Sequence, residues 1–118
     1  MLTNTVPDNK GNKFKVITLC GSTRFKNEFL QAQKELTLKG YIVISVGLFG
    51  HSGDAEVWEN DTKTMLDHMH LAKIDMAESI FVVNPGGYIG TSTEREIYHA
   101  LNTNKIVYSI VPIGINNI

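Results

Sequence analysis

Four short apolar runs recur along the chain, at residues 15–20, 41–46, 80–83 and 105–111. Most of their residues are β-branched or aromatic, and within each run the apolar residues are largely continuous rather than alternating with polar ones. Strands of this kind are typical of a parallel sheet whose two faces are both covered by helices. The runs therefore predict four strands of such a sheet.

Helical periodicity separates these runs. Apolar side chains recur at spacings of four, three and four residues over residues 25–36 and again over residues 65–76, where we expect a helix over about residues 61–77. A third helix is expected before residue 105, with Ile97, Ala100 and Leu101 on its inner side. The alternation predicts a three-layer α/β sandwich, Rossmann-like or flavodoxin-like, around a mainly parallel sheet of four to five strands.

The length of 118 residues is that of one domain. We predict a single domain over residues 14–118, preceded by a flexible polar extension over residues 1–13. Its 11 basic and 12 acidic residues give a net charge of −1. This balance argues against a nucleic-acid polymer or an anionic membrane as partner, because both require a basic face. A small anion held by one or two residues is compatible with it.

The cysteine content and the hydropathy restrict the cellular setting. Cys20 is the single cysteine, which excludes an internal disulfide and a multi-cysteine metal site. The first residues lack the apolar core of a signal peptide, and no apolar run approaches the ~20 residues that span a membrane. These features predict a cytoplasmic protein.

Ligands of open α/β sheets bind beyond the carboxyl ends of the strands, and three loops reach that edge, at residues 21–24, 47–60 and 84–96. In the first loop, Gly21 permits a tight turn, and Ser22 or Thr23 can cap a helix that starts near Arg24. The helix N-terminus and the guanidinium both favour a bound phosphate. The alternative is a plain cap followed by a solvated arginine. Cys20 is expected to be a packed strand end rather than a nucleophile.

The middle loop, of about fourteen residues, is longer than most connections in a compact domain, and such loops are often functional. Its Trp58 could stack on a flat base, although covering a core edge is the commoner role. On the next helix, His68 and His70 are two residues apart and point to different faces, so they cannot share a metal ion and we predict no metal site. Asp67 and His70 share a face, either as a catalytic support or as an exposed pair.

The third loop leads into a helix through the sequence TSTERE, which holds two glutamates. Thr91 and Glu94 fit a capping box, with Thr91 as the N-cap. Glu96 then lies about 200° around the helix from Glu94, beside the buried stripe, where the helix dipole favours its ionised form. A carboxylate at the mouth of a strand-edge pocket can attack an anomeric carbon. The alternative is a surface pair with His99 or Arg95.

The segments VITLCGSTRF, MAES, IFVV and GYIGTSTEREIYHALNTNKIVY, taken together, resemble the nucleoside 2-deoxyribosyltransferase-like family, which includes 2'-deoxynucleoside 5'-phosphate N-hydrolases. The resemblance covers roughly residues 15–110. Its most specific part is Glu96-Ile97, followed by Ala100-Leu101 and Lys105, because the nucleophilic glutamate of the family stands in that pattern. The resemblance implies that Glu96 attacks C1' of a nucleoside or nucleoside 5'-monophosphate, that the base leaves, and that water or a second base completes the reaction.

The resemblance also implies a set of binding residues. The sequence GSxR is similar to that of the N-hydrolases, in which the serine and arginine hold a 5'-phosphate, and the matching positions are Ser22 and Arg24. His70 or Asp67 would assist the base, without a metal or redox cofactor. A homodimer or higher oligomer is expected, with the partner subunit closing part of the pocket. Other residues expected to contact the substrate are Gly21, Gly87, Tyr88, Gly90, Ser92 and Thr93.

The chain departs from this family at two positions. The family often has an aspartate where this chain has His70, and a glycine where it has Glu94. Both departures bear on the exact reaction and on the preference for deoxyribose. The sequence PGGYIGTSTERE is also similar, with one extra residue, to a motif of phosphoribohydrolases that release cytokinin bases from nucleotides. A nucleotide-binding sensor without catalysis is the alternative from another functional class.

Overall fold

The computed structural model describes residues 1–11 and 13–114 of the chain. Four parallel strands form one sheet in the order β2-β1-β3-β4: β1 (Val16–Gly21), β2 (Ile42–Ile44), β3 (Ser79–Val83) and β4 (Ile106–Ser109). Each strand lies on one of the four apolar runs, extended by one residue at Gly21 and at Ser79. The parallel sheet predicted from those runs is confirmed.

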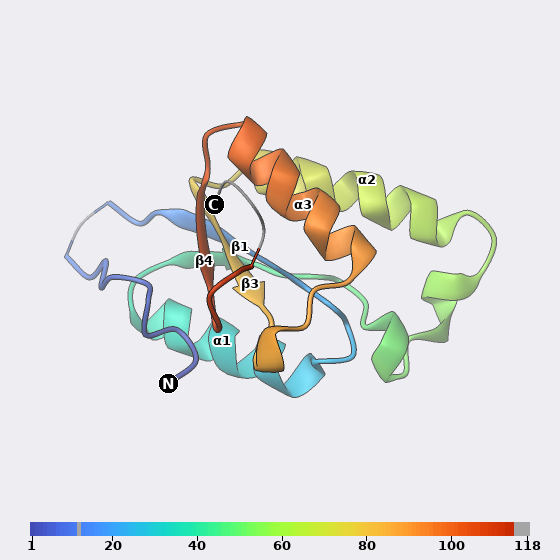
Figure 1. Ribbon diagram of the computed structural model, residues 1–118, viewed down its shortest axis with the longest axis horizontal. Coiled ribbons are helices and arrows are strands. Elements are labelled where there is room, and N and C mark those ends of the chain that lie inside the picture. The colour runs from blue at the N-terminus through green and yellow to red at the C-terminus, as the bar shows by residue number, and fades with distance from the viewer. Residues whose placement is uncertain (12, 115–118) are drawn as a thin grey trace.

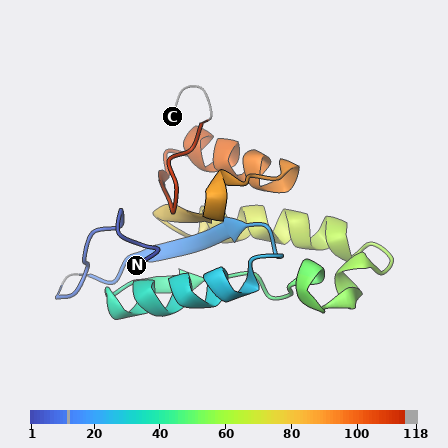
Figure 2. The same cartoon turned by 60° about the horizontal axis from the view of Figure 1, so that its bottom comes forward.

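Helices cover both faces of this sheet (Figure 1, Figure 2). Helix α1 (Lys26–Leu38) packs on one face, where Phe29 and Leu36 meet Leu19 in one core cluster. Helices α2 (Thr62–Asp75) and α3 (Thr91–Asn102) pack on the other face, where Ile74 and Ile97 form a second cluster with strand residues. All five residues of β3 are buried, which explains its uninterrupted apolar run. The three-layer α/β prediction is confirmed.

The strand order creates a crevice at one edge of the sheet. β1 lies between β2 and β3, and the chain leaves β1 through α1 on one face and β3 through α3 on the other. Such a reversal of winding opens a crevice beyond the carboxyl ends of the two strands, and ligands of flavodoxin-like sheets bind there. Gly21 stands at this point with φ of 152°, and a Cβ there would lie 2.6 Å from the carbonyl oxygen of Val83. Glycine is therefore required at this end of β1.

The N-terminal residues differ from the expected flexible extension. Thr3 and Val6 are buried, and Val6 belongs to the core cluster beneath α1. Glu35 of α1 accepts hydrogen bonds from the backbone N–H and the hydroxyl of Thr3, at 3.0 and 2.8 Å. The Lys39 ammonium donates to the carbonyl of Val6 at 2.8 Å. Residues 1–9 are thus held by hydrogen bonds to Glu35 of α1 and to Lys39 at its end, where a loose segment was expected.

The middle loop contains two short 3-10 helices, η1 (Gly50–Ser52) and η2 (Ala55–Trp58). They lie beside the start of α2 and beyond the carboxyl end of β2 (Figure 1). Within the described ranges, none of the helices has both the length and the apolarity needed to cross a membrane.

Candidate active site

A cavity of about 290 Å³ lies at the crevice beyond β1 and β3. Small-molecule sites typically have volumes of ~300–1,000 Å³, so the cavity is near the lower end of that range. All three loops that were expected at this edge contribute to its wall, together with α2 and α3. The edge predicted from the β/α alternation is therefore where the structure forms its cavity.

The first loop places Gly21, Ser22 and Arg24 on the cavity wall, as predicted. The expected cap is wrong, because α1 begins at Lys26 after Phe25 and has no side-chain cap. A turn intervenes, in which the Phe25 N–H donates to the Ser22 carbonyl at 3.1 Å. The Ser22 hydroxyl instead accepts a hydrogen bond of 2.9 Å from Nε of Arg24. The guanidinium also stacks 4.6 Å from the ring centre of Tyr88, so two contacts hold it at the cavity.

The middle loop contributes His51 and Trp58 to the wall. Trp58 is 51% exposed and lines the cavity, so it does not act as the cover of a core edge. Its indole N–H donates to the Gly50 carbonyl at 3.0 Å, and its ring meets the His51 ring edge-to-face at 5.0 Å. His51 Nδ1 in turn lies 2.8 Å from the Thr23 hydroxyl. These contacts tie the middle loop to the first loop; sequence reasoning assigned no role to His51 or Thr23 in the site.

Helix α3 separates its two glutamates as predicted, although the cap differs. Gly90 is the N-cap, and Thr91 is already helical without a side-chain cap bond, so the expected capping box is absent from this helix start. The glycine carbonyl accepts the Glu94 N–H at 2.9 Å. Glu94 is exposed, whereas the Glu96 side chain keeps 13% of its accessible surface and lines the cavity. Thr93 lies three residues before Glu96, on the same face of the helix, and is also buried. Glu96 therefore lies beside the buried side of α3, as expected.

The environment of Glu96 makes its carboxyl group a weaker acid than usual. Burial raises the pKa of Glu96 to about 7, and the negative charge of Asp67 adds to this shift. A hydrogen bond from the Cys20 thiol and the charges of Lys63 and Arg95 act in the opposite direction. The expectation that the helix dipole keeps this group ionised is therefore corrected, because loss of solvation outweighs the dipole.

His70 faces Glu96 from α2. Its side chain is 8% exposed, and Nε2 lies 3.8 Å from Oε1 of Glu96 and 3.5 Å from Sγ of Cys20. Burial and then the charge of Lys73 lower the pKa of His70 to about 4, so the imidazole is neutral at pH 7. Burial and the neighbouring Glu96 raise the pKa of the Cys20 thiol well above its usual value. This agrees with Cys20 as a packed strand end, but its contact with two site residues was not foreseen.

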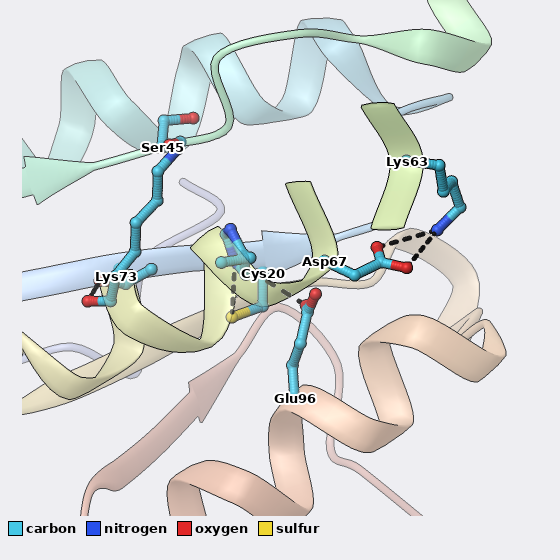
Figure 3. A network of polar contacts seen from close by, with 8 residues as sticks. Cys20, Ser45, Lys63, Asp67, Lys73 and Glu96 are labelled. Carbon is cyan, nitrogen blue, oxygen red and sulfur yellow. Dashed lines mark hydrogen bonds and ion pairs between the residues drawn. The ribbon is translucent and has the colours of Figure 1, made fainter. Parts of the chain in front are cut away.

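Two lysines of α2 complete the polar network around these groups (Figure 3). Lys63 donates to both carboxylate oxygens of Asp67, at 2.9 and 3.0 Å. Lys73 donates to the carbonyl of Ser45 beyond β2 at 2.9 Å. Asp67 thus pairs with Lys63, and its charge raises the pKa of His70 only as a minor effect. Both lysines line the cavity, and neither was singled out from the sequence.

The third loop places Tyr88, Gly90, Ser92 and Thr93 on the cavity wall, as predicted. Gly87 is the exception among the described residues, because it is exposed in the short turn Pro85–Gly87 and is absent from the wall.

Asn84, directly before that turn, was missed by the sequence reasoning and is fully buried. Its side-chain oxygen accepts the N–H groups of Ile110 and Val111, both at 3.1 Å, and its amide donates to the Val111 carbonyl at 2.9 Å. Asn84 thereby fixes the base of the third loop to the segment after β4. The signal available in the sequence was a polar residue directly after a continuous apolar run, because a polar side chain buried there needs hydrogen-bond partners.

A second hollow, of about 280 Å³, lies between α2 and α3. Asp67, Ser92 and Glu96 line both this hollow and the main cavity. Glu96 therefore borders both hollows.

Comparisons of the chain with protein-family models, with curated proteins and with solved structures found no match. What the protein does is therefore inferred from its own residues and from the cavity that they form.

Proposed function

We propose that this protein cleaves or transfers the N-glycosidic bond of a (2'-deoxy)nucleoside 5'-monophosphate or nucleoside, with Glu96 as the nucleophile. The observation that carries the proposal is a buried carboxylate, with a pKa of about 7, in a cavity that also holds an arginine. The resemblance to the nucleoside 2-deoxyribosyltransferase-like family selects the same glutamate by its pattern. The chemistry of the cavity and the sequence pattern thus both support Glu96 as the nucleophile.

In the proposed reaction, the ionised carboxylate of Glu96 attacks C1' of the sugar. The bond to the base breaks, and the base leaves with the electron pair and takes up a proton from solvent. Water, or a second base, then attacks C1' and releases the carboxylate. A partly desolvated carboxylate suits this role, because it is a stronger nucleophile than a fully solvated one.

The positive charge of Arg24 supports the binding of a negatively charged phosphate at the first loop. Its Nε is bound to Ser22, and its stacking on Tyr88 holds the guanidinium plane. A guanidinium held in this way suits the planar, bidentate contact with phosphate oxygens. We therefore propose that the 5'-phosphate lies at Ser22 and Arg24, and that the exposed face of Trp58 is available to the base.

The state of His70 restricts its role. With a pKa of about 4, it is neutral near pH 7 and is a poor acid for protonating a leaving base. The same pKa makes it a weak base, but a neutral imidazole 3.8 Å from Glu96 can accept a hydrogen bond from the water that hydrolyses the glycosyl–Glu96 ester. We propose that His70 positions this water, which favours hydrolysis over transfer.

A nucleotide sensor without catalysis is the second candidate function. The observation that favours it is the replacement of the expected second-helix acid by a histidine that burial keeps neutral. A sensor would be stabilised against thermal unfolding by nucleotides without releasing base.

The proposal is tested by incubating the protein with ribo- and deoxynucleoside 5'-monophosphates and their nucleosides, and measuring free base by chromatography. We expect base release from at least one of them. Glu96→Gln should lower the rate by at least about 100-fold, as loss of a nucleophile does. Glu94→Gln is the matched control, because that side chain is exposed two residues away and should leave the rate unchanged. Release of no base from any substrate would refute the enzyme proposal, and an unchanged rate in Glu96→Gln would refute Glu96 as its nucleophile.

A further inference from the structure

Three potential metal ligands from three different elements meet beside the cavity, which His70 and Glu96 line and behind which Cys20 is buried. Cys20 comes from β1, His70 from α2 and Glu96 from α3, and their ligand atoms all lie within 4.8 Å of one another. Figure 3 shows the side chains of Cys20 and Glu96 next to each other in the polar network. The two histidines of α2 could not form a site, but one of them does meet ligands from other elements.

The spacing of these atoms is close to that of a zinc site. Bonds of ~2.3 Å to sulfur and ~2.0–2.2 Å to nitrogen and oxygen place the ligand atoms of a tetrahedral zinc ion about 3.3–3.6 Å apart. The Cys20 Sγ to His70 Nε2 separation is 3.5 Å, and the His70 Nε2 to Glu96 Oε1 separation is 3.8 Å. The third pair, Cys20 Sγ and a Glu96 oxygen, lies within 4.8 Å, so side-chain rotation is needed to bring all three atoms onto one ion.

The charges of these groups balance a divalent ion in a buried place. A thiolate and a carboxylate together carry two negative charges, and a neutral imidazole adds none, so a bound Zn²⁺ forms a neutral unit. This matters because an uncompensated buried charge is costly. The Cys20 thiol releases its proton to solvent as the zinc–sulfur bond forms.

The open side of the site and the chemistry of its ligands also fit a zinc ion. Because His70 and Glu96 both line the cavity, the fourth coordination position is open on that side. The ligands are a soft thiolate, an imidazole and one carboxylate, a set that suits Zn²⁺ better than Mg²⁺ or Ca²⁺.

We propose that Cys20, His70 and Glu96 bind one Zn²⁺ ion, with the fourth coordination position facing the cavity. Zinc binding itself is independent of the glycosidic reaction. Its consequence for activity rests on the proposed function: an ion bound to Glu96 removes the nucleophile, so zinc is a reversible inhibitor that competes with the nucleotide.

The test is made on the metal-free full chain. Titration with Zn²⁺ in a calorimeter should give one equivalent bound, with protons released. Titration with Co²⁺ should give a near-ultraviolet thiolate-to-cobalt charge-transfer band. Because Cys20 is the single cysteine of the chain, that band identifies it as a ligand without any variant. Cys20→Ser should abolish the band. Glu96→Gln should weaken zinc binding by at least about tenfold, because replacing a residue that merely supports a metal ligand already costs about that much.

The matched control is His99→Ala. His99 Nε2 lies 2.7 Å from a carboxylate oxygen of Asp75, so it is another histidine–carboxylate contact that could hold zinc. This variant should bind zinc as the wild type does. A wild-type protein without the charge-transfer band, zinc affinity unchanged in Cys20→Ser, or zinc binding lost in His99→Ala would each overturn the proposal. Failure to release base in any assay would refute the enzyme proposal alone, because the cobalt band needs no substrate.

Discussion

Nε2 of His70 lies 3.8 Å from Oε1 of Glu96, yet the two groups do not form an ion pair at neutral pH. Burial lowers the pKa of the imidazole to about 4 and raises the pKa of the carboxyl group to about 7. Over the intervening pH range both side chains are therefore mainly uncharged. Loss of solvation outweighs their mutual attraction, and it leaves a carboxyl group that ionises in the range where enzymes work.

The first prediction concerns the pH dependence of base release. The proposed nucleophile is the ionised carboxylate, which is the main form of Glu96 only above pH 7, because its pKa is about 7. We expect kcat/KM to rise about tenfold per pH unit below pH 7 and to level off above it. Initial rates between pH 5 and 9 at low substrate concentration measure this profile. Activity that falls as the pH rises from 6 to 8 would instead indicate that protonated Glu96 acts as an acid.

The second prediction concerns stability. A carboxyl group whose pKa rises on folding from 4.5 to about 7 stabilises the fold fully below pH 4.5, and this contribution is lost as the pH rises through 7. Replacing it by a neutral amide removes the loss. Glu96→Gln should therefore exceed the wild type by about 2–3 kcal/mol in free energy of unfolding at pH 8, and by little at pH 4.5.

Urea denaturation of both proteins at the two pH values measures this difference. The titration of His70 has the opposite sign, because its lowered pKa removes stability as the pH falls towards 4. It is present in both proteins and cancels from the comparison. The exposed Glu94→Gln should show no pH-dependent difference, and a gain in Glu96→Gln that is equal at both pH values would contradict the burial of an ionising group.

The sheet and its helices were predictable because their signals are local. Continuous apolar runs and spacings of three and four residues depend only on neighbouring positions. The separation of Glu94 from Glu96 was equally local, since it follows from helical geometry alone. The predicted N-cap was wrong, because Gly90 rather than Thr91 precedes the helix. The separation of the two glutamates does not depend on the cap, so that prediction was unaffected.

The contacts that define the chemistry of the site were not predictable, because they join distant positions. Cys20 and His70 are 50 residues apart, and their meeting depends on how α2 lies on β1. The same applies to Thr3 and Glu35, which are 32 residues apart. The ionisation of Glu96 was misjudged for a related reason: the helix dipole is visible in the sequence, whereas the degree of burial depends on every element that packs against α3.

The third prediction concerns Arg24. If its guanidinium binds the 5'-phosphate, Arg24→Gln should raise KM for monophosphates by about 10–100-fold, the usual worth of a charged hydrogen bond, and leave nucleosides unaffected. Steady-state kinetics on a monophosphate and its nucleoside separate the two effects. Lys26→Gln is the control, because it removes a nearby positive charge that stacks on Phe49 instead of lining the cavity. Equal losses for both substrates would place Arg24 outside phosphate binding.

The fourth prediction concerns Asn84. Its side chain satisfies two backbone N–H groups and one carbonyl at the base of the third loop. Asn84→Ala leaves these groups without partners in a buried place, so it should lower the free energy of unfolding by about 2–4 kcal/mol. Thermal denaturation measures the loss. The exposed Asn102→Ala at the end of α3 should cost little, and a similarly small cost for Asn84→Ala would mean that water replaces the lost bonds.

The fifth prediction concerns the N-terminal segment. Burial opposes ionisation of Glu35, but hydrogen bonds from Gln31 and Thr3 outweigh it and lower the pKa of this carboxyl group. Its anchoring of residues 2 and 3 is therefore present above pH 4.5 and is lost as the pH falls below that value. Glu35→Ala should release the segment at pH 7, and we expect faster tryptic cleavage after Lys10 than in the wild type.

Limited proteolysis followed by mass spectrometry measures that cleavage, with Lys34→Ala as an exposed control on the same helix. In the wild type, cleavage should accelerate only when the segment unbinds from α1, because a protease needs the chain extended. Val6 contributes separately, through its burial in the core cluster beneath α1. Equal cleavage rates in Glu35→Ala and the wild type would therefore show that this apolar contact alone holds the segment, and that the hydrogen bonds to Glu35 only set its register on the helix.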